Sequence, residues 1–205
     1  MTAVDHRPGG ADHDDARRPG GADHDDTRRA KGAPTYVSVI GASVASPELA
    51  AKAEELGALL AEAGCIVVCG GRDGVMAAVA RGVKAKGGVS IGILPEADRS
   101  RANHDLTYSV CSAMGYARNL SVVASGDVVI AVGGAWGTLS EIALARNLGR
   151  TVVLLDSWTV RPPGAPGAVT AAGGPVERES LKGEPDGLLR AHTPAEAVRL
   201  ALPAL

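Results

Sequence analysis

The sequence contains no phenylalanine, and its aromatic side chains, three Tyr and two Trp, make up 2% of the 205 residues. Proteins that bind single-stranded nucleic acid stack bases on aromatic side chains, so this chain has little material for that task. The net charge is −2, which leaves no basic excess to attract a phosphate backbone. Both features disfavour nucleic acid as the partner.

Cysteine is scarce as well, with Cys65, Cys69 and Cys111 as the three examples. This number provides no paired disulfide framework, and no histidine lies beside the cysteines to complete a zinc site. No apolar run approaches the length of a membrane span, and the N-terminus is too polar for a signal peptide. We therefore expect a cytoplasmic protein with neither a metal site nor a membrane partner.

Residues 1–34 differ in composition from the rest of the chain. The segment RPGGADHDDAR (Arg7–Arg17) recurs as RPGGADHDDTR (Arg18–Arg28), a tandem repeat of eleven residues. The repeat has almost no apolar side chains whose burial could offset the entropy of ordering. We predict a disordered tail over residues 1–34 and one folded domain over residues 35–205. The Asp-His clusters could bind a metal weakly, but a solvated polar tail is the favoured interpretation.

Apolar runs alternate with helical patterns from Thr35 onward. Continuous apolar runs predict buried strands at Tyr36–Ser43, Cys65–Gly71, Val89–Pro95, Leu106–Val110, Val128–Val132 and Thr151–Ser157. Helical spacing and capping residues predict helices that begin after Ser46, span Val75–Ala85 and Gly115–Ser125, follow Gly137, and begin after Thr193. Pro, Gly and Ala dominate residues 159–180, which predicts a flexible loop or, less favoured, a lid.

This alternation predicts an α/β fold: a single doubly wound Rossmann-like domain with a parallel sheet and helices on both faces. Three strands run into glycine-rich turns, at Gly41–Ser43, Gly70–Gly74 and Gly133–Gly137. A helix N-terminus after such a turn binds phosphate through free N–H groups and the helix dipole. The NAD fingerprint GxGxxG and the P-loop GxxxxGK[ST] are both absent, which disfavours a dinucleotide dehydrogenase and an NTPase.

We therefore expect a small phosphorylated ligand where these turns meet, at the carboxyl edge of the sheet. The expected ligand contacts come from the three turns and the segments beside them: Gly41, Ala42, Ser43, Gly70, Gly71, Gly74, Val75, Met76, Asn119, Gly133, Gly134, Gly137 and Thr138. Asp73 is interpreted as an N-terminal cap of the following helix. Trp136 could stack on a flat ring, cover the turn or lie at a dimer contact.

Three motifs occur in this order: GGRDGVM (Gly70–Met76), YARN (Tyr116–Asn119) and GGAWGTLSE (Gly133–Glu141). Together they resemble the LONELY GUY (LOG) superfamily, and the chain is more similar to its branch of small bacterial Rossmann proteins that includes the molybdenum cofactor carrier protein. The resemblance spans about residues 36–202. It implies a homo-oligomer, most simply a dimer.

LOG enzymes hydrolyse the N-glycosidic bond of nucleoside 5′-monophosphates, and the resemblance implies catalytic roles for Arg118 and Glu141. A carboxylate can stabilise the oxocarbenium-like sugar or activate the attacking water, and a guanidinium suits ribose or phosphate oxygens. The sequence departs from the enzyme pattern at several positions. Gly133 stands in place of Pro, Ala135 in place of Gly and Asn119 in place of Lys, and the histidine has no counterpart.

Three hypotheses follow. The first is a protein that binds a phosphorylated nucleotide-like or pterin ligand, needs no other cofactor and carries the molybdenum cofactor. The second is a nucleoside monophosphate hydrolase, for which Arg118 and Glu141 are retained. The third is a DNA-processing protein, because the wider superfamily includes such relatives. The departures favour binding over turnover, and the composition disfavours DNA.

Removal of residues 1–34 is expected to leave the melting temperature unchanged, because the repeat has no apolar face to bury. The measurement is calorimetry of the full chain beside the truncated one. A melting temperature several degrees lower after truncation would contradict the prediction.

Overall fold

The structure is a computed structural model, which describes residues 33–160, 169–170 and 187–203. The tandem repeat and most of residues 159–180 lie outside these ranges, and so do the predictions made for them. Among the described residues, no helix combines the length and the apolar composition that crossing a bilayer requires.

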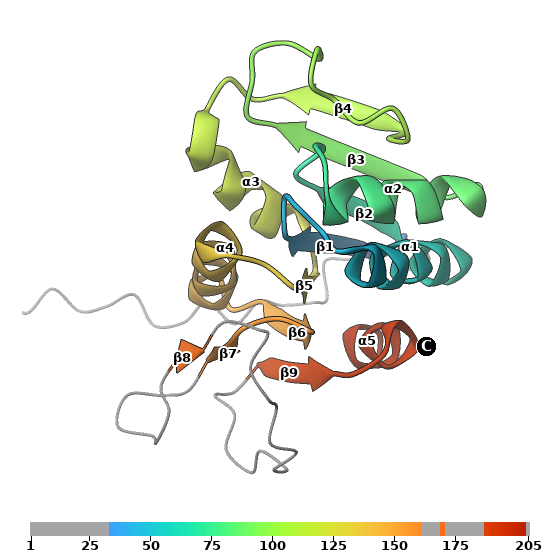
Figure 1. The fold of residues 1–205 in the computed structure, drawn as a ribbon, viewed down its shortest axis with the longest axis vertical. Helices are drawn as coiled ribbons and strands as arrows, with labels where there is room; N and C mark the ends of the chain where they lie inside the picture. Colours follow the sequence, from blue (N-terminus) through green and yellow to red (C-terminus); the bar gives the residue numbers. More distant parts are fainter. Residues whose placement is uncertain (1–32, 161–168, 171–186, 204–205) are drawn as a thin grey trace, which may run out of the picture.

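Seven parallel strands form one sheet in the order β4-β3-β2-β1-β5-β6-β9 (Figure 1). The strands are β1 (Tyr36–Gly41), β2 (Ile66–Cys69), β3 (Val89–Leu94), β4 (Tyr108–Cys111), β5 (Val128–Val132), β6 (Thr151–Leu155) and β9 (Leu188–Ala191). A separate antiparallel pair consists of β7 (Thr159–Val160) and β8 (Val169–Thr170). The chain order reverses beside β1, which pairs with β2 on one side and β5 on the other.

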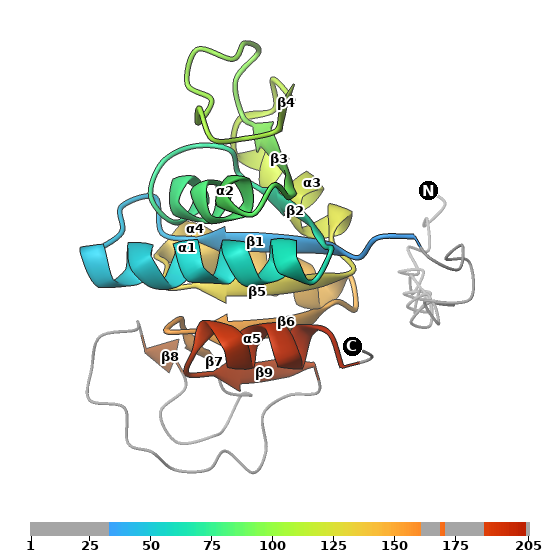
Figure 2. The same ribbon diagram turned by 90° about the vertical axis from the view of Figure 1, so that its right-hand side faces the viewer.

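Helices cover both faces of the sheet, so the predicted doubly wound α/β fold is confirmed (Figures 1 and 2). One face carries α1 (Pro47–Glu62), α2 (Val75–Ala85) and α5 (Pro194–Ala201), and the other carries α3 (Arg118–Ser125) and α4 (Trp136–Asn147). A single 3₁₀ turn, η2 (Gly115–Ala117), leads into α3. The apolar core is divided accordingly into one buried cluster on each side of the sheet.

Local sequence signals account for the helix starts. The Ser46 hydroxyl accepts a hydrogen bond from the N–H of Leu49 at 3.2 Å, and Pro47 occupies the first turn of α1. The Thr193 hydroxyl caps α5 in the same way, through the N–H of Glu196 at 3.2 Å. Both caps were predicted from the sequence, and each supplies an acceptor to an N–H that the helix itself cannot satisfy.

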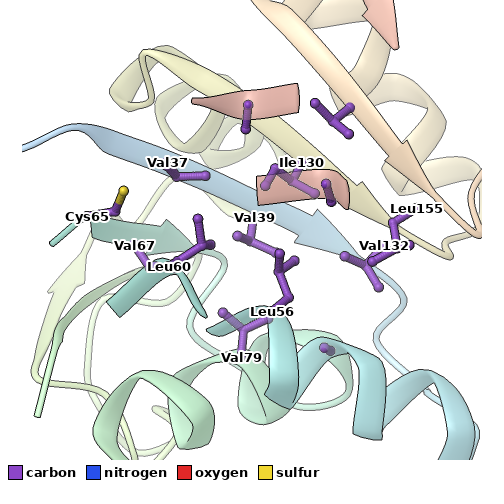
Figure 3. Packing of buried hydrophobic residues seen from close by; sticks show 14 of the residues in the cluster. Val37, Val39, Leu56, Leu60, Cys65, Val67, Val79, Ile130, Val132 and Leu155 are labelled. Carbon is purple, nitrogen blue, oxygen red and sulfur yellow. The ribbon is translucent and has the colours of Figure 1, made fainter. Parts of the chain in front are cut away.

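The larger core cluster joins α1 and α2 to the sheet (Figure 3). Leu56 and Leu60 of α1 and Val79 of α2 are fully buried against Val39 and Val67 of the central strands. Complete burial of such a side chain stabilises the fold by about 1.5–3 kcal/mol. This packing holds the first turn of α2 against the carboxyl edge of the sheet.

The two edge strands of the sheet, β4 and β9, differ from the sequence prediction. Strand β4 begins at Tyr108 and includes Cys111, whereas the apolar pattern placed a strand at Leu106–Val110. Strand β9 was not predicted at all, because its four residues include Arg190 and form no apolar run of the usual length. Its hydrogen-bonded partner β6 supplies the parallel register that so short a segment cannot specify.

Gly82→Ala is expected to destabilise the protein by about 1–3 kcal/mol through overpacking, although alanine is the better helix former. A Cβ at Gly82 would overlap with the backbone carbonyl of Glu54, so α1 and α2 would have to separate. The measurement is urea unfolding. Gly137→Ala is the matched control, because a Cβ there meets open space and should not destabilise; equal effects at both positions would contradict the packing argument.

Candidate functional site

A cavity of about 310 Å³ lies at the carboxyl ends of β2, β1 and β5. Its walls come from the turns that follow these strands, from the end of η2 and from the first residues of α3 and α4. This position, beside the reversal of strand order, is where open parallel sheets bind ligands. The cavity has the volume of a small site for one organic ligand, at the lower end of about 300–1,000 Å³.

The cavity brings together most of the residues predicted for the site. Those that line it are Gly41, Ala42, Ser43, Gly70, Met76, Arg118, Asn119, Gly137, Thr138 and Glu141. They come from two turns and three helices that lie far apart in the chain. The parallel sheet places them together because it aligns the carboxyl ends of its strands at one edge.

The other predicted residues of the GGRDGVM turn lie behind the cavity wall. Gly71 has a φ of +73° and faces β3, where a Cβ would lie 3.0 Å from the Cα of Gly92. The Val75 N–H donates to the carbonyl of Ala42 at 2.9 Å, and its side chain is fully buried. Gly74 approaches the same Ala42–Ser43 backbone closely. These three residues shape the turn without lining the cavity.

Gly133 and Gly134 also lie outside the cavity lining. The Gly133 carbonyl accepts a hydrogen bond from the Ser157 hydroxyl at 2.6 Å. Gly134 has a φ of +117° and lies against the side chain of Thr138, which leaves no room for a Cβ. The two glycines therefore allow the bend that directs the start of α4 toward the cavity.

Arg118, the first residue of α3, forms part of the cavity floor. Its side chain occupies the space next to Gly70. A Cβ at position 70 would overlap with the guanidinium and would lie 2.6 Å from the Sδ of Met76. Arg118 is only 9% exposed, and its Nε has no hydrogen-bond partner among the described residues. A buried guanidinium with a donor that lacks a partner is costly and suits an anionic or oxygen-rich ligand.

Glu141 lies in the same cavity, one turn into α4, and is 8% exposed. Burial raises the pKa of its carboxyl from 4.5 to about 7, and the positive charge of Arg118 opposes this shift. Burial also lowers the pKa of Arg118, against the attraction of Glu141. Glu141 can therefore exchange a proton near neutral pH, which is the property that a general acid or base needs.

Two helix N-termini open onto the cavity. At α4, no side chain among the described residues caps the helix, so its first N–H groups lack an intrahelical or capping acceptor. Ala135, Gly137 and Thr138 of this end line the cavity. At α2 no described side chain caps the helix either, although the first N–H, of Val75, donates to the Ala42 carbonyl, and Met76 of the first turn lines the cavity. The dipoles of both helices favour negative charge in this space.

Sequence reasoning missed five residues that line the cavity: Ile40, Arg72, Asp73, Tyr116 and Ala135. Arg72 and Asp73 lie within the GGRDGVM motif and Tyr116 opens the YARN motif, so these polar and aromatic side chains were a usable signal. Asp73 does not cap α2, and the interpretation of Asp73 as a cap is wrong. Gly74, with a φ of +67°, occupies the cap position in place of Asp73, and a glycine has no side chain to cap the helix.

Two tryptophans support the GGAWG turn at the start of α4. Trp158 is buried, and its Nε1–H donates to the carbonyl of Ala135 at 3.1 Å. Trp136 is 74% exposed and packs on Trp158 with ring centroids 5.1 Å apart. One face of the Trp136 ring thus packs against Trp158, and Trp136 is not among the residues that line the cavity.

Cys69 is the last residue of β2, directly before the GGRDGVM turn, and its side chain is fully buried. Burial raises the pKa of its thiol to about 11, so the group stays protonated. Within the described ranges, no group of three His, Cys, Asp or Glu side chains is arranged to hold a metal ion. Arg118 and Glu141 are the buried ionisable side chains that line the cavity.

A sequence profile of the SLOG cluster4 family matches residues 34–181. An uncharacterized protein of Archaeoglobus fulgidus is 41% identical over 119 residues, which cover 58% of this chain and 78% of the relative. The region that matches the family profile includes every residue that lines the cavity, because these residues lie between Ile40 and Glu141.

Solved structures of two related proteins have the same fold. The molybdenum cofactor binding protein of Rippkaea orientalis is 27% identical with a TM-score of 0.66, over 82% of this chain and 96% of that protein. The molybdenum cofactor carrier protein of Chlamydomonas reinhardtii is 27% identical with a TM-score of 0.63, over the same shares of the two chains. Similarity to the carrier-like branch of the superfamily, which the motifs predicted, is thereby confirmed.

A more distant likeness extends to DNA processing protein A of Helicobacter pylori, which is 24% identical with a TM-score of 0.51 over 60% of this chain and 65% of that protein. At this identity the comparison concerns the fold alone.

Glu141→Gln is expected to stabilise the protein increasingly as the pH rises. The raised pKa means that the wild type is stabilised below about pH 4.5 and loses that stability as the pH rises through about 7. At about 1.4 kcal/mol per pKa unit, the loss amounts to about 3 kcal/mol, and glutamine avoids it. The measurement is the free energy of unfolding of both proteins between pH 5 and pH 8.5.

Glu55→Gln on the exposed side of α1 is the control, and it should change the stability much less than Glu141→Gln does. A difference between wild type and Glu141→Gln that stays constant from pH 5 to pH 8.5 would contradict the burial argument.

Proposed function

The chain belongs to the SLOG cluster4 family, and from this premise we propose that it binds a phosphorylated nucleotide-like or pterin ligand, in the manner of a molybdenum cofactor carrier. The observation that carries the proposal is the buried guanidinium of Arg118, whose Nε has no partner and which shares one cavity with the uncapped start of α4. Similarity to two molybdenum cofactor proteins over most of their length supports the ligand class.

The cavity offers different chemistry at its different walls. In this proposal the phosphoryl group lies at the start of α4, where the free N–H groups and the Thr138 hydroxyl donate hydrogen bonds. The flat ring system contacts Ile40, Met76 and Tyr116, of which Tyr116 is 93% exposed and free to move onto a ligand. Arg118 donates to acceptor atoms between the two ends.

Binding without turnover is the favoured form of the proposal. Asn119 lines the cavity at the position where the resemblance to LOG enzymes implies a lysine, so one positive charge is missing. The histidine of those enzymes also has no counterpart in the sequence. A pocket with fewer cations stabilises the transition state of N-glycosidic cleavage less, while ring contacts and helix N-termini still hold the ligand.

Hydrolysis of nucleoside 5′-monophosphates is the second candidate, and the state of Glu141 favours it. A carboxyl with a pKa of about 7 beside a guanidinium can activate water near neutral pH, and its ionised form can stabilise an oxocarbenium-like sugar. In this alternative Arg118 orients the ribose or the phosphate.

Ligand binding is expected to raise the melting temperature of the full chain in the presence of AMP or a pterin phosphate, through linkage to the folded state. Arg118→Ala should weaken binding at least tenfold, because it removes charge-assisted hydrogen bonds. Arg199→Ala, on the exposed side of α5, is the matched control and should bind like wild type. The measurement is isothermal titration calorimetry, and an unmoved melting curve with every probe would contradict the proposal. Native mass spectrometry of the freshly purified protein would show any co-purified ligand and the oligomeric state.

Glu141→Gln separates carrier from hydrolase. A carrier releases no free base from AMP with either protein, and the variant changes affinity only modestly. A hydrolase releases base with the wild type and loses most turnover in the variant, because an amide can neither act as a base nor match a cation. The measurement is chromatographic detection of adenine, and rapid release that depends on Glu141 would make the hydrolase the leading function.

A further inference from the structure

Arg72 is a second guanidinium in the cavity, and neither the proposed function nor the sequence motifs give it a role. It follows β2, and its side chain is 30% exposed. Its one ion pair joins Nη1 to Oε1 of Glu96 at 3.6 Å, which is longer than a hydrogen bond. Within the described part of the chain, this side chain makes no hydrogen bond, and Arg72 lines the cavity.

Glu96, just beyond the end of β3, holds two arginines. Its Oε1 lies 3.6 Å from Nη1 of Arg72 and 3.9 Å from Nη1 of Arg101, and its buried Oε2 has no partner among the described residues. One carboxylate thus orients two guanidinium groups, which leaves one positive charge uncompensated within the cluster. The nearby carboxylate of Asp73 is exposed to solvent, where its opposing field is weakened.

The two arginines differ in where they face. Arg72 lines the ligand cavity, whereas Arg101 lines a separate, more open cavity of about 320 Å³ formed by the β3–β4 loop. Asp73 lies in the wall between the two cavities. Arg101 therefore pairs with Glu96 as Arg72 does, but it does not line the ligand cavity.

Arg72 and the start of α4 lie on opposite sides of β1. The GGRDGVM turn follows β2 and the α4 turn follows β5, and β1 separates these two strands in the sheet. Strands are spaced about 4.8 Å apart, so the two turns lie roughly 10 Å apart. At this separation the backbones of the two turns provide two different places for anionic groups.

We propose that Arg72, oriented by Glu96, binds a second anionic group at the end of the ligand opposite the phosphoryl group held by α4. The inference rests on the proposed function, that the cavity binds a phosphorylated ligand. It assigns the ligand to small organic molecules that carry phosphoryl groups at two separate ends. Arg118 lies between the two anion positions, and the charge of Arg72 contributes to the lowered pKa of Arg118.

The test compares AMP, ADP and adenosine 3′,5′-bisphosphate by isothermal titration calorimetry on the full chain. ADP adds its second phosphoryl group beside the first, and the bisphosphate adds it at another position of the ribose. Wild type should bind the bisphosphate about tenfold more tightly than AMP, with a smaller gain for ADP. Arg72→Ala should bring the ratio of the bisphosphate and AMP affinities close to 1, and Arg72→Lys should restore part of it.

Arg101→Ala is the matched control, because it removes the other guanidinium bound by Glu96 and should keep the wild-type ratio. Glu96→Gln should lower the ratio while the affinity for AMP stays the same, which a merely structural effect on the fold would not do. An unchanged ratio in Arg72→Ala, or a ratio of 1 in wild type that still binds AMP, would overturn this inference alone. A wild type that binds none of the three nucleotides would overturn the proposed function.

Discussion

The site depends on the absence of a side chain at Gly70. The guanidinium of Arg118 lies where a Cβ would be, with the Sδ of Met76 beside it. Any other residue at position 70 would displace the Arg118 guanidinium from this place, because its Cβ would overlap with Nη1. The contact also joins the two halves of the sheet, because Gly70 follows β2 and α3 leads into β5.

This contact places the positive charge of Arg118 in a buried environment, which disfavours the charged form. Burial lowers the pKa of Arg118 and raises that of Glu141, so both groups are less stable in their ionised forms than they would be in water. No hydrogen bond relieves either side chain among the described residues. The cavity therefore holds a buried donor without a protein partner, together with the start of α4, which no described side chain caps. A ligand that satisfies them gains affinity without reorganising the protein, since the fold has already met the cost of arranging them.

The sequence predicted the fold more completely than it predicted which residues line the cavity. The strands β1, β2, β3, β5 and β6 and the helix α2 follow from apolar runs and glycine stops, because these signals are local. The short strand β9 could not be predicted, since its pairing with β6 decides its structure. Within the site, Gly71, Gly133 and Gly134 were expected to touch the ligand, but a positive φ is needed for the bend itself and does not reveal which side faces the cavity. Arg72 was missed because a charged residue between glycines looks like an ordinary solvated turn until a cavity and a partner such as Glu96 are seen.

The sequence by itself determined that the chain forms a doubly wound parallel sheet, that three glycine-rich turns follow its strands, and that Arg118 and Glu141 belong to motifs. These properties depend on side-chain periodicity and backbone freedom, which short segments carry on their own. Only the tertiary structure decided which atoms share the cavity, that Arg118 is buried above Gly70, and that Glu141 has a pKa near 7. Burial, charge–charge distance and unsatisfied hydrogen bonds arise between segments that are distant in the chain, so they have no local signature and exist only once the sheet has aligned its turns at one edge.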